Sequence, residues 1–240
     1  MKTTYIKKSL AVVVILLFVS VSVIPSTGTI IEKKSTIPTF YDGNILYVGG
    51  SGTGNYSRIQ DAIDNASDGD TVFVYNGEYN EHLHINKQLS LIGESRYNTY
   101  IVSNDPGDML VINADWVIVK EFTMDTRKPT HPKCNGILSY GNHTTIIDNV
   151  FIRNKRAIHL INSYKNYISN NNITTNYDNI FLERSNNNTL TNNSFDNNRY
   201  HAFELIDSHN NYISNNTIND TQGDGTISLS SSTNNIVINN

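Results

Sequence analysis

The octapeptide Asn166-Tyr167-Ile168-Ser169-Asn170-Asn171-Asn172-Ile173 recurs twice further along the chain. Its copies are Asn188-Thr189-Leu190-Thr191-Asn192-Asn193-Ser194-Phe195 and Asn211-Tyr212-Ile213-Ser214-Asn215-Asn216-Thr217-Ile218. A looser copy precedes them at 145–151, and the opening of another follows at 235–240. Short apolar runs that return at a fixed interval indicate a solenoid, in which each repeat packs only on its neighbours.

One apolar position in each copy sets the period. These marker residues lie 22 or 23 positions apart and are Ile146, Ile168, Leu190, Ile213 and Ile236. A second apolar motif stands ten positions before three of them, as Ile158-His159-Leu160, Ile180-Phe181-Leu182 and Phe203-Glu204-Leu205. Each repeat thus holds short alternating stretches typical of strands, and none keeps a helical spacing for long.

Asparagine marks the corners between these stretches. Asn tolerates the left-handed backbone of a sharp bend, and its amide can hydrogen-bond to an equivalent Asn one coil away. The predicted ladder columns are Asn166, Asn188, Asn211 and Asn234, two residues before the markers, and Asn170, Asn192 and Asn215, two residues after them. The sequence therefore predicts an all-β fold, a right-handed parallel β-helix with coils of about 22–23 residues.

One segment, 56–66, is predicted to form a helix. It would place four apolar residues on one face, namely Ile59, Ala62, Ile63 and Ala66. Ser57 followed by Gln60 has the pattern of a capping box at the helix N-terminus. Because the end of a solenoid exposes apolar core and unpaired strand, we expect this short helix to cap the N-terminal end.

The chain divides into three predicted parts. Residues 1–28 join a basic start to an apolar run, which predicts a signal peptide; an uncleaved N-terminal anchor is the alternative, because no clean Ala-x-Ala cleavage site follows. Residues 29–45 form a linker and 46–240 the β-helix domain. The last copy stops before its second apolar position, so we expect the domain to be C-terminally incomplete.

The composition limits the classes of partner that we expect for this chain. The formal net charge is −4 and the sequence contains no basic run, so nucleic acid is not an expected partner. A membrane is expected only through the possible N-terminal anchor. Cys134 is the only cysteine, so no disulfide can form within the chain and stability must come from stacking.

Two groups of residues carry a family resemblance. Asn55-Tyr56-Ser57-Arg58-Ile59-Gln60-Asp61-Ala62-Ile63, with Asp68-Gly69-Asp70-Thr71-Val72 and Gly77-Glu78-Tyr79, resembles the N-terminal part of secreted pectin-lyase-like β-helix proteins. The Asn-Tyr-Ile-Ser-Asn-Asn coils are similar to those of exported surface proteins called NosD-like, or carbohydrate-binding and sugar-hydrolase β-helix domains. The resemblance covers about 46–240 and implies the fold, which hosts lyases, hydrolases, esterases, adhesins and plain surface proteins.

The catalytic motifs of the enzymes in this fold are missing. Asp-Phe-x-Phe-Gly and Leu-Gly-Arg-Pro-Trp, which pectin methylesterases carry, do not occur, and neither does the Asp-Asp pair or Gly-His-Gly of polygalacturonases. The Arg-x-Pro-x-x-Arg pattern of pectate lyases is echoed at 127–134 without its second arginine. Catalysis is therefore not the leading expectation.

One outward-facing column remains as a candidate site. Aligned repeats place His159, Phe181 and Glu204 in register, with Glu183 two positions beyond this column and Arg184 and Asp207 in the next. Glu183 and Glu204 would form a carboxylate pair of the kind that glycosidases use, with His159 and Arg184 beside it. Candidate substrate-binding residues border this column, namely Arg153, Arg156, Tyr200, His201 and Asp207. The alternative is an ordinary solvated face.

Metal binding has weaker candidates. In a strand, His82 and His84 would point to one side and could hold copper, and Ca²⁺ would serve a lyase. His131 and Cys134 also have ligand-like spacing, within a long insertion whose residues 125–135 are the best candidate for a binding loop.

Tyrosines near the predicted corners have two possible roles, sugar binding or packing between coils. They are Tyr164, Tyr167, Tyr177, Tyr200 and Tyr212. Their rings would either stack on sugars or pack against the next coil.

The sequence thus favours an exported cell-surface module, non-catalytic, that presents a face to a polysaccharide or another cell-envelope component. A carbohydrate-active enzyme, either a polysaccharide lyase or a glycoside hydrolase, is the first alternative. A copper-handling accessory protein is the second.

Overall fold

The structure is a computed structural model that describes residues 43–127, 134–219 and 226–240. All of these belong to one compact unit, Phe40–Asn240. The predicted signal or anchor at 1–28 lies outside the described residues. Among the residues that are described, no helix is long and apolar enough to cross a membrane.

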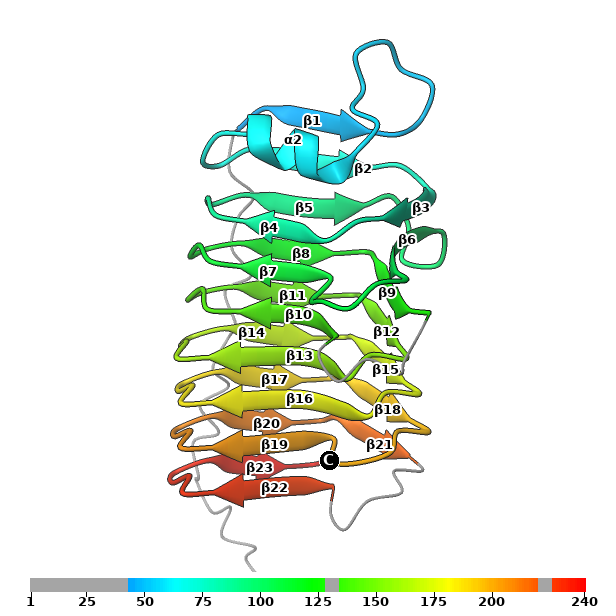
Figure 1. The fold of residues 1–240 in the computed structure, drawn as a ribbon. Coiled ribbons are helices and arrows are strands. Elements are labelled where there is room, and N and C mark those ends of the chain that lie inside the picture. The colour runs from blue at the N-terminus through cyan, green and yellow to red at the C-terminus, as the bar shows by residue number, and fades with distance from the viewer. Residues whose placement is uncertain (1–42, 128–133, 220–225) are drawn as a thin grey trace, which may run out of the picture. The chain divides into compact units, whose positions relative to one another are not determined.

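Three parallel sheets form the walls of the β-helix (Figure 1). Sheet A holds β1 (Ile45–Val48), β2 (Thr71–Val74), β5 (Ser90–Gly93), β8 (Ile118–Lys120), β11 (Thr145–Ile147), β14 (Tyr167–Ser169), β17 (Thr189–Thr191), β20 (Tyr212–Ser214) and β23 (Ile236–Ile238). Sheet B holds β3 (Gly77–Asn80), β6 (Thr99–Ser103), β9 (Thr123–Thr126), β12 (Val150–Ile152), β15 (Asn172–Thr174), β18 (Ser194–Asp196) and β21 (Thr217–Asn219). Sheet C holds β4 (Leu83–Ile85), β7 (Leu110–Ile112), β10 (Asn135–Ser139), β13 (Arg156–Ile161), β16 (Asp178–Glu183), β19 (Phe203–Ile206) and β22 (Ile227–Ser230). Successive coils run A, B, C, so we name the three bends between sheets the A–B, B–C and C–A corners.

The strand register confirms the repeat and the predicted β-helix. Ile146, Ile168, Leu190 and Ile213 pair in line along sheet A. The next partner is Val237 rather than the predicted marker Ile236, because that coil is one residue longer than its neighbours. Val119 precedes Ile146 in the same line, and the coil between them is longer than any that follows it.

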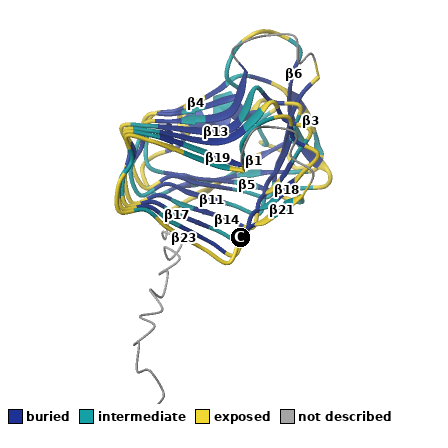
Figure 2. Ribbon diagram, turned by 90° about the horizontal axis from the view of Figure 1, so that it is seen from below, coloured by how far each residue is buried: buried dark blue, intermediate teal, exposed yellow. Residues whose placement is uncertain are grey.

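The inward residues of the three sheets build one continuous core. Figure 2 shows the coils end-on, with buried residues along the sheets and exposed ones concentrated at the corners. Phe122, Phe151, Phe195 and Phe203 are among the largest fully buried side chains. Each such side chain contributes about 1.5–3 kcal/mol by leaving water, so stacking alone can hold a chain without disulfides.

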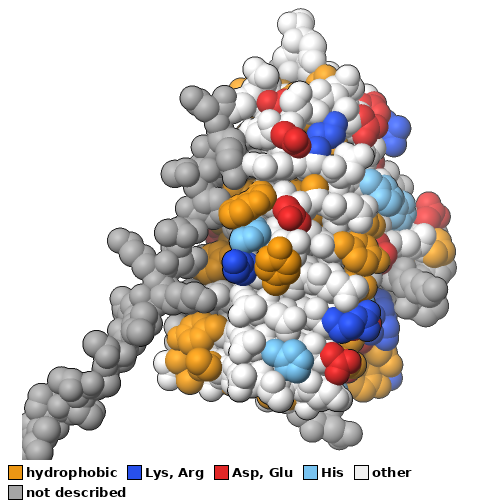
Figure 3. All heavy atoms as spheres, turned by 90° about the vertical axis from the view of Figure 1, so that its left-hand side faces the viewer, with side chains coloured by type: hydrophobic (Ala, Val, Ile, Leu, Met, Phe, Trp, Pro, Cys, Tyr) orange, Lys and Arg blue, Asp and Glu red, His pale blue; other side chains and the backbone are white. Residues whose placement is uncertain are grey.

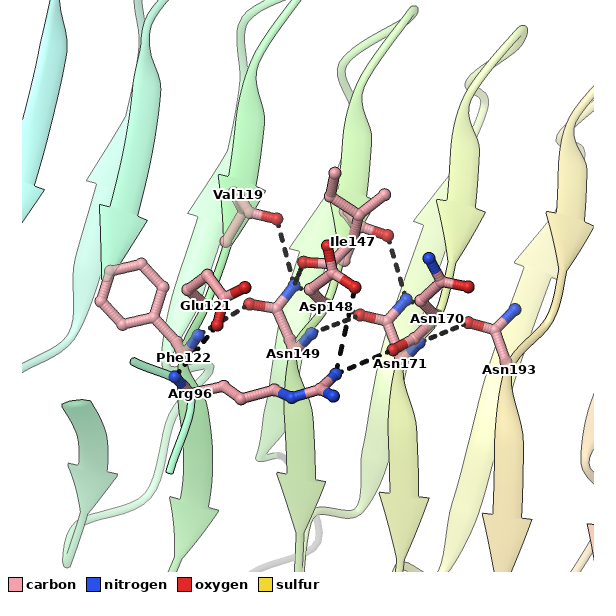
Figure 4. Close-up of polar contacts among 11 residues, drawn as sticks. Arg96, Val119, Glu121, Phe122, Ile147, Asp148, Asn149, Asn170, Asn171 and Asn193 are labelled. Atoms are coloured by element: carbon pink, nitrogen blue, oxygen red, sulfur yellow. Dashed lines mark hydrogen bonds and ion pairs between the residues drawn. The ribbon is translucent and has the colours of Figure 1, made fainter. Parts of the chain in front are cut away.

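Asparagine ladders occur at the A–B corner, one residue later than predicted. Asn171 Oδ1 accepts from Asn149 N and Nδ2, and Asn171 Nδ2 donates to Asn193 Oδ1 and Ile146 O (Figure 4). The predicted column is wrong: Asn170 and its equivalents instead take the left-handed conformation, with φ of 57° at Asn170. In each Asn-Asn pair, the first residue turns the chain and the second turns inward to bond the next coil.

Arg96 crosses this corner on the outside (Figure 4). Its backbone N donates to Glu121 Oε2, and its Nη1 donates to Asn170 O at 3.3 Å and lies 4.0 Å from Asp148 Oδ1. One loop residue thereby joins three successive coils.

Both other corners carry ladders too. At the C–A corner the ladder runs through Asn166, Asn188, Asn211 and Asn235, so the predicted member Asn234 is wrong. It shifts for the same reason as the last marker: Asn234 is left-handed, with φ of 57°, and the extra residue of that coil moves the ladder position to Asn235. At the B–C corner a third ladder was not predicted, and it joins Asn154, Asn176 and Asn198.

The predicted helix is confirmed as α2 (Ile59–Asn65), but its capping is different. Ser57 does not form the expected capping box, and the N-cap residue Arg58 makes no side-chain cap. Glu81, from the following coil, accepts from the backbone N–H groups of Ile59 and Gln60 at 2.8 and 3.1 Å. A carboxylate at the positive end of the helix satisfies orphan donors that a local Ser cannot reach here.

Lys87 holds the other end of α2. Its Nζ donates to the carbonyls of Asp64 and Ala66, at the negative end of the helix. Ile59, Ala62 and Ile63 are buried beneath α2, which therefore caps the core as expected.

Candidate functional site

The strand register places the residues of the predicted sheet C column in line. His159 pairs with Phe181, and Phe181 with Glu204, on the adjacent strands β13, β16 and β19. Glu183 pairs with Ile206, two residues further along. Arg184 and Asp207 both follow their strands in left-handed conformations, with φ of 49° and 48°, and so share the next column.

His159 is buried, which the solvated-face alternative did not anticipate. Only 6% of the residue is exposed, because its ring packs 4.6 Å from Phe181 and lies near Arg156 and Glu183. Burial, reinforced by the positive charge of Arg156, lowers the pKa of His159 to about 4, although Glu183 acts in the opposite direction. The imidazole is therefore neutral at neutral pH, 3.5 Å from Glu183 Oε2 through its Nε2.

This buried imidazole predicts an acid-sensitive fold. The unfolded state binds a proton near pH 6.5, whereas the folded state does so only near pH 4. Stability therefore falls as the pH drops from about 6.5 to about 4, and His159 accounts for at most about 3 kcal/mol of the loss. Urea denaturation at several pH values measures it. In His159→Phe, which matches Phe181 of the next coil, the dependence in this range should weaken; an unchanged dependence would contradict the assignment.

Glu183 forms an ion pair with the arginine that follows it. Glu183 Oε1 lies 2.7 Å from Arg184 Nη2, and Arg184 Nε donates to Asn162 Oδ1. The register places Glu204 opposite Phe181, diagonal to Glu183. Glu183 thus lies between Arg184 and His159, and its carboxylate is held by the ion pair with Arg184.

A second group of side chains lies at the B–C corner beside this column. We call Lys155, Arg156, Tyr177, Arg199 and Tyr200 the corner cluster. Lys155 Nζ lies 3.7 Å from the centre of the Tyr177 ring, and the Arg199 guanidinium carbon lies 5.0 Å from it. These three residues occupy equivalent positions in successive coils, each following a member of the Asn154 ladder.

Tyr200 and Arg156 extend the corner cluster in two directions. The rings of Tyr177 and Tyr200 lie 4.6 Å apart, and the Tyr177 hydroxyl donates to the Tyr200 hydroxyl at 3.3 Å. This hydrogen bond is the main reason why the pKa of Tyr177 is raised. Arg156 stacks over Phe181 at 4.4 Å and so connects the cluster to the sheet C column.

The structure places the remaining predicted binding residues differently. Arg153 forms an ion pair with Asp125, a contact within the wall of the β-helix. His201 is half-buried, and its carbonyl accepts from Asn179 Nδ2. Asp207 directly follows β19 and lies at the C–A corner, at the opposite end of the strand from the corner cluster. Of the five predicted residues, Arg156 and Tyr200 belong to the corner cluster.

Sequence reasoning missed Lys155 and Arg199 altogether. The signal was present, because Lys155, Tyr177 and Arg199 follow each other at the 22-residue period. Of the other predicted corner tyrosines, Tyr164 is exposed and Tyr167 and Tyr212 are half-buried.

The predicted metal candidates do not form a metal site in the part of the chain that is described. β4 begins at Leu83, so His82 precedes the strand; its Nδ1 lies 2.9 Å from Asp108 O and its Nε2 lies 3.3 Å from Ser103 Oγ. His84 is exposed. No group of three or more His, Cys, Asp or Glu side chains converges among residues 43–127, 134–219 and 226–240. His131 and most of the predicted loop 125–135 lie outside these ranges.

Comparison with known proteins identifies relatives of the β-helix. The model of the family described as "Periplasmic copper-binding protein (NosD)" matches residues 63–240. No curated protein matches the chain. Among solved structures, a pectin methylesterase in complex with a hexasaccharide is 16% identical, with a TM-score of 0.55, over 80% of this chain and 82% of that one.

A second solved structure supports the same fold. The catalytic domain of a GH87 α-1,3-glucanase, in complex with nigerose, is 15% identical, with a TM-score of 0.56, over 79% of this chain and 41% of that one. At such identities the similarity shows the fold alone. The residues that would hold the family's copper are not found among the described ones, because no third ligand lies beside His82 or His84.

Proposed function

The chain belongs to the NosD family, and from that premise we propose that it is a non-catalytic, extracytoplasmic β-helix module that binds an anionic polysaccharide of the cell envelope. The family is described as periplasmic, which agrees with the expected export. The corner cluster is the proposed binding site.

The observation that carries this proposal is the stack of Lys155, Tyr177 and Arg199. Two cations flank one aromatic ring across three coils, held in place by the Asn ladder beneath them. Cation–π contacts fix the long Lys and Arg side chains, so that less conformational entropy is lost when they bind an anion. The spacing of the coils, about 4.8 Å, repeats these charges along the axis of an extended polymer.

The charge of the corner cluster favours an acidic ligand. Lys155 and Arg156 share the carboxylate of Asp178, whose Oδ2 lies 3.6 Å from Lys155 Nζ and 3.8 Å from Arg156 Nε, whereas Arg199 lies over the Tyr177 and Tyr200 rings. This is a local excess of positive charge on a chain whose net charge is −4. Carboxylates of a polyuronate would meet Arg and Lys donors there, while Tyr177 and Tyr200 offer ring edges and hydroxyls.

Binding without cleavage fits the surroundings of the acids. Glu183 forms an ion pair with Arg184 and lies next to the neutral His159, so its carboxylate is already engaged by side chains of the β-helix. The enzyme alternative would need Glu183 and Glu204 to act together from diagonal positions on β16 and β19. The two solved structures of the same fold are described in complex with a hexasaccharide and with nigerose, and we propose that this chain shares only the binding of a saccharide.

Calorimetric titration of residues 43–240 with polygalacturonate tests the site. The double variant Lys155→Ala/Arg199→Ala should weaken binding at least about tenfold, because each lost charge-assisted contact is worth about 1.5 kcal/mol or more. Raising the salt concentration should weaken the wild type much more than the double variant.

Lys165→Ala is the matched control, since it removes a cation from the C–A corner. It should bind polygalacturonate as the wild type does. Equal affinities for wild type and the double variant, or equally tight binding of uncharged dextran, would contradict the proposal.

A further inference from the structure

One column of equivalent positions at the C–A corner holds Asn in its later coils but bulky side chains in its earlier ones. Its residues are all left-handed, with φ between 54° and 61°, and they are Trp116, His143, Lys165, Asn187, Asn210 and Asn234. The last three are Asn, the residue that tolerates this conformation best. A left-handed Trp is an outlier, since its Cβ is forced close to the backbone. Strained residues of this kind concentrate at ligand-binding positions.

The strained positions hold an aromatic surface at the corner. The Trp116 and His143 rings stack at 3.9 Å with an angle of 7° between their planes, and Tyr164 meets His143 edge-on at 5.8 Å. Trp116, Tyr140 and Tyr164 are each more than 40% exposed. We call Trp116, Tyr140, His143, Tyr164 and Lys165 the aromatic corner. Figure 3 faces this side of the β-helix and shows hydrophobic, His and Lys side chains gathered at mid-height.

Hydrogen bonds beneath the rings brace the aromatic corner. Trp116 N donates to Asn142 O, and His143 N to Tyr164 O. Asn142 Nδ2 donates to Asp115 Oδ1, and Asn142 Oδ1 accepts from Tyr164 N. The aromatic side chains are therefore mounted on a rigid backbone, which reduces the entropy that a ligand must offset.

The chemistry of the aromatic corner differs from that of the corner cluster. Its one lysine, Lys165, and the carboxylate of Asp115 act on His143 in opposite directions. The pKa of His143 is lowered, first by burial and then by Lys165, so its ring is neutral at neutral pH. The exposed part of the aromatic corner consists of three aromatic side chains with polar groups around them. Three side chains are far fewer than the 20–30 residues that each partner contributes to a stable protein interface, so this surface is too small for a protein partner.

We propose that the aromatic corner binds a neutral sugar ring of a polysaccharide, with the C–H face of the pyranose on the exposed indole and phenol rings. Aromatic faces carry negative quadrupolar charge and attract such weakly positive C–H groups. His143 and the Lys165 ammonium are placed to hydrogen-bond hydroxyls at the ring edge. The site lies at a different corner from the corner cluster and takes an uncharged ligand, so it does not depend on the proposed function.

Trp116 is the chain's only tryptophan, so its fluorescence reports on this corner alone. The probes are cellohexaose, maltohexaose and mannohexaose. We expect at least one of them to shift the emission to shorter wavelength and to protect the indole from acrylamide. A shift with none of the three, or a shift only with polygalacturonate or with phospholipid vesicles, would overturn the proposal.

Variants separate binding from folding. Tyr164→Ala should abolish the fluorescence change, whereas Tyr97→Ala, which removes an exposed tyrosine at the A–B corner, should leave it intact. Trp116→Asn installs the residue of the equivalent coils and should melt no lower than Trp116→Ala, yet lose calorimetric binding of the responding hexaose at least tenfold. Retained binding in Trp116→Asn would overturn the proposal.

Discussion

Asn171→Ala should lower the free energy of unfolding by about 5 kcal/mol, the largest effect expected for a single substitution here. The side chain is buried and makes four hydrogen bonds, two accepted from Asn149 and two donated to Ile146 O and Asn193 Oδ1. Each bond is worth about 1 kcal/mol, and the stranded backbone N–H of Asn149 adds about 1–3 kcal/mol. Thermal unfolding followed by circular dichroism should show a melting temperature lower by about 10–20 °C.

Asn170→Gly is the matched control for the ladder. Asn170 is the left-handed neighbour, with an exposed side chain, and Gly adopts this conformation without strain. The melting temperature should change by less than about 2 °C, within about 0.5 kcal/mol. Equal losses in both variants would mean that the ladder does not distinguish the two positions.

Glu81→Ala should be the second most damaging change, at about 4 kcal/mol. The buried carboxylate accepts from Ile59 N and Gln60 N, and hydrogen bonds to a charged group contribute about 1.5–3 kcal/mol each. Without the Glu81 carboxylate, the backbone N–H groups of Ile59 and Gln60 have no acceptor, and α2 is held less firmly over the first coils. Hydrogen exchange of 45–93 should accelerate while that of the central coils stays slow, because a solenoid is stabilised repeat by repeat.

Glu78→Ala removes an equivalent carboxylate three residues earlier. Its side chain is half exposed and pairs with Arg127 on the surface, with Glu78 Oε1 2.8 Å from Arg127 Nη1. An exposed ion pair is worth at most about 1 kcal/mol. If Glu78→Ala accelerates the exchange of 45–93 as much as Glu81→Ala does, the capping role of Glu81 is wrong.

The fold could be predicted because each coil repeats its apolar positions. Ile146, Ile168, Leu190 and Ile213 are separated by near-constant intervals, and side chains that repeat this way can only stack. The final marker failed because the last coil is longer, and a sequence without the paired strand does not show which of Ile236 and Val237 points inward. The same ambiguity affected the Asn-Asn pairs, where both residues suit a corner and only the backbone conformation decides.

The helix cap could not be read locally. A capping box is a pattern within four residues, and Ser57 with Gln60 matched it. The actual cap is Glu81, 22 residues after Ile59, and it reaches α2 only because the next coil passes below the helix. A long-range contact of this kind leaves no signal in the local sequence.

The candidate site was predicted in part. The column of His159, Phe181 and Glu204 follows from the period, but the burial of His159 depends on how Arg156 and Phe181 pack over it. The corner cluster was not predicted, because Lys155 and Arg199 become neighbours of Tyr177 only once the coils stack.

The function proposed for the chain is to bind an acidic polysaccharide without cutting it. The most direct measurement is to incubate the protein with polygalacturonate of defined length, with and without Ca²⁺, and to determine binding and polymer length on the same sample. We expect saturable binding with an unchanged length distribution and no new reducing ends or unsaturated products. Shortened or unsaturated chains that disappear in Glu183→Gln or Glu204→Gln would contradict the claim and establish an enzyme.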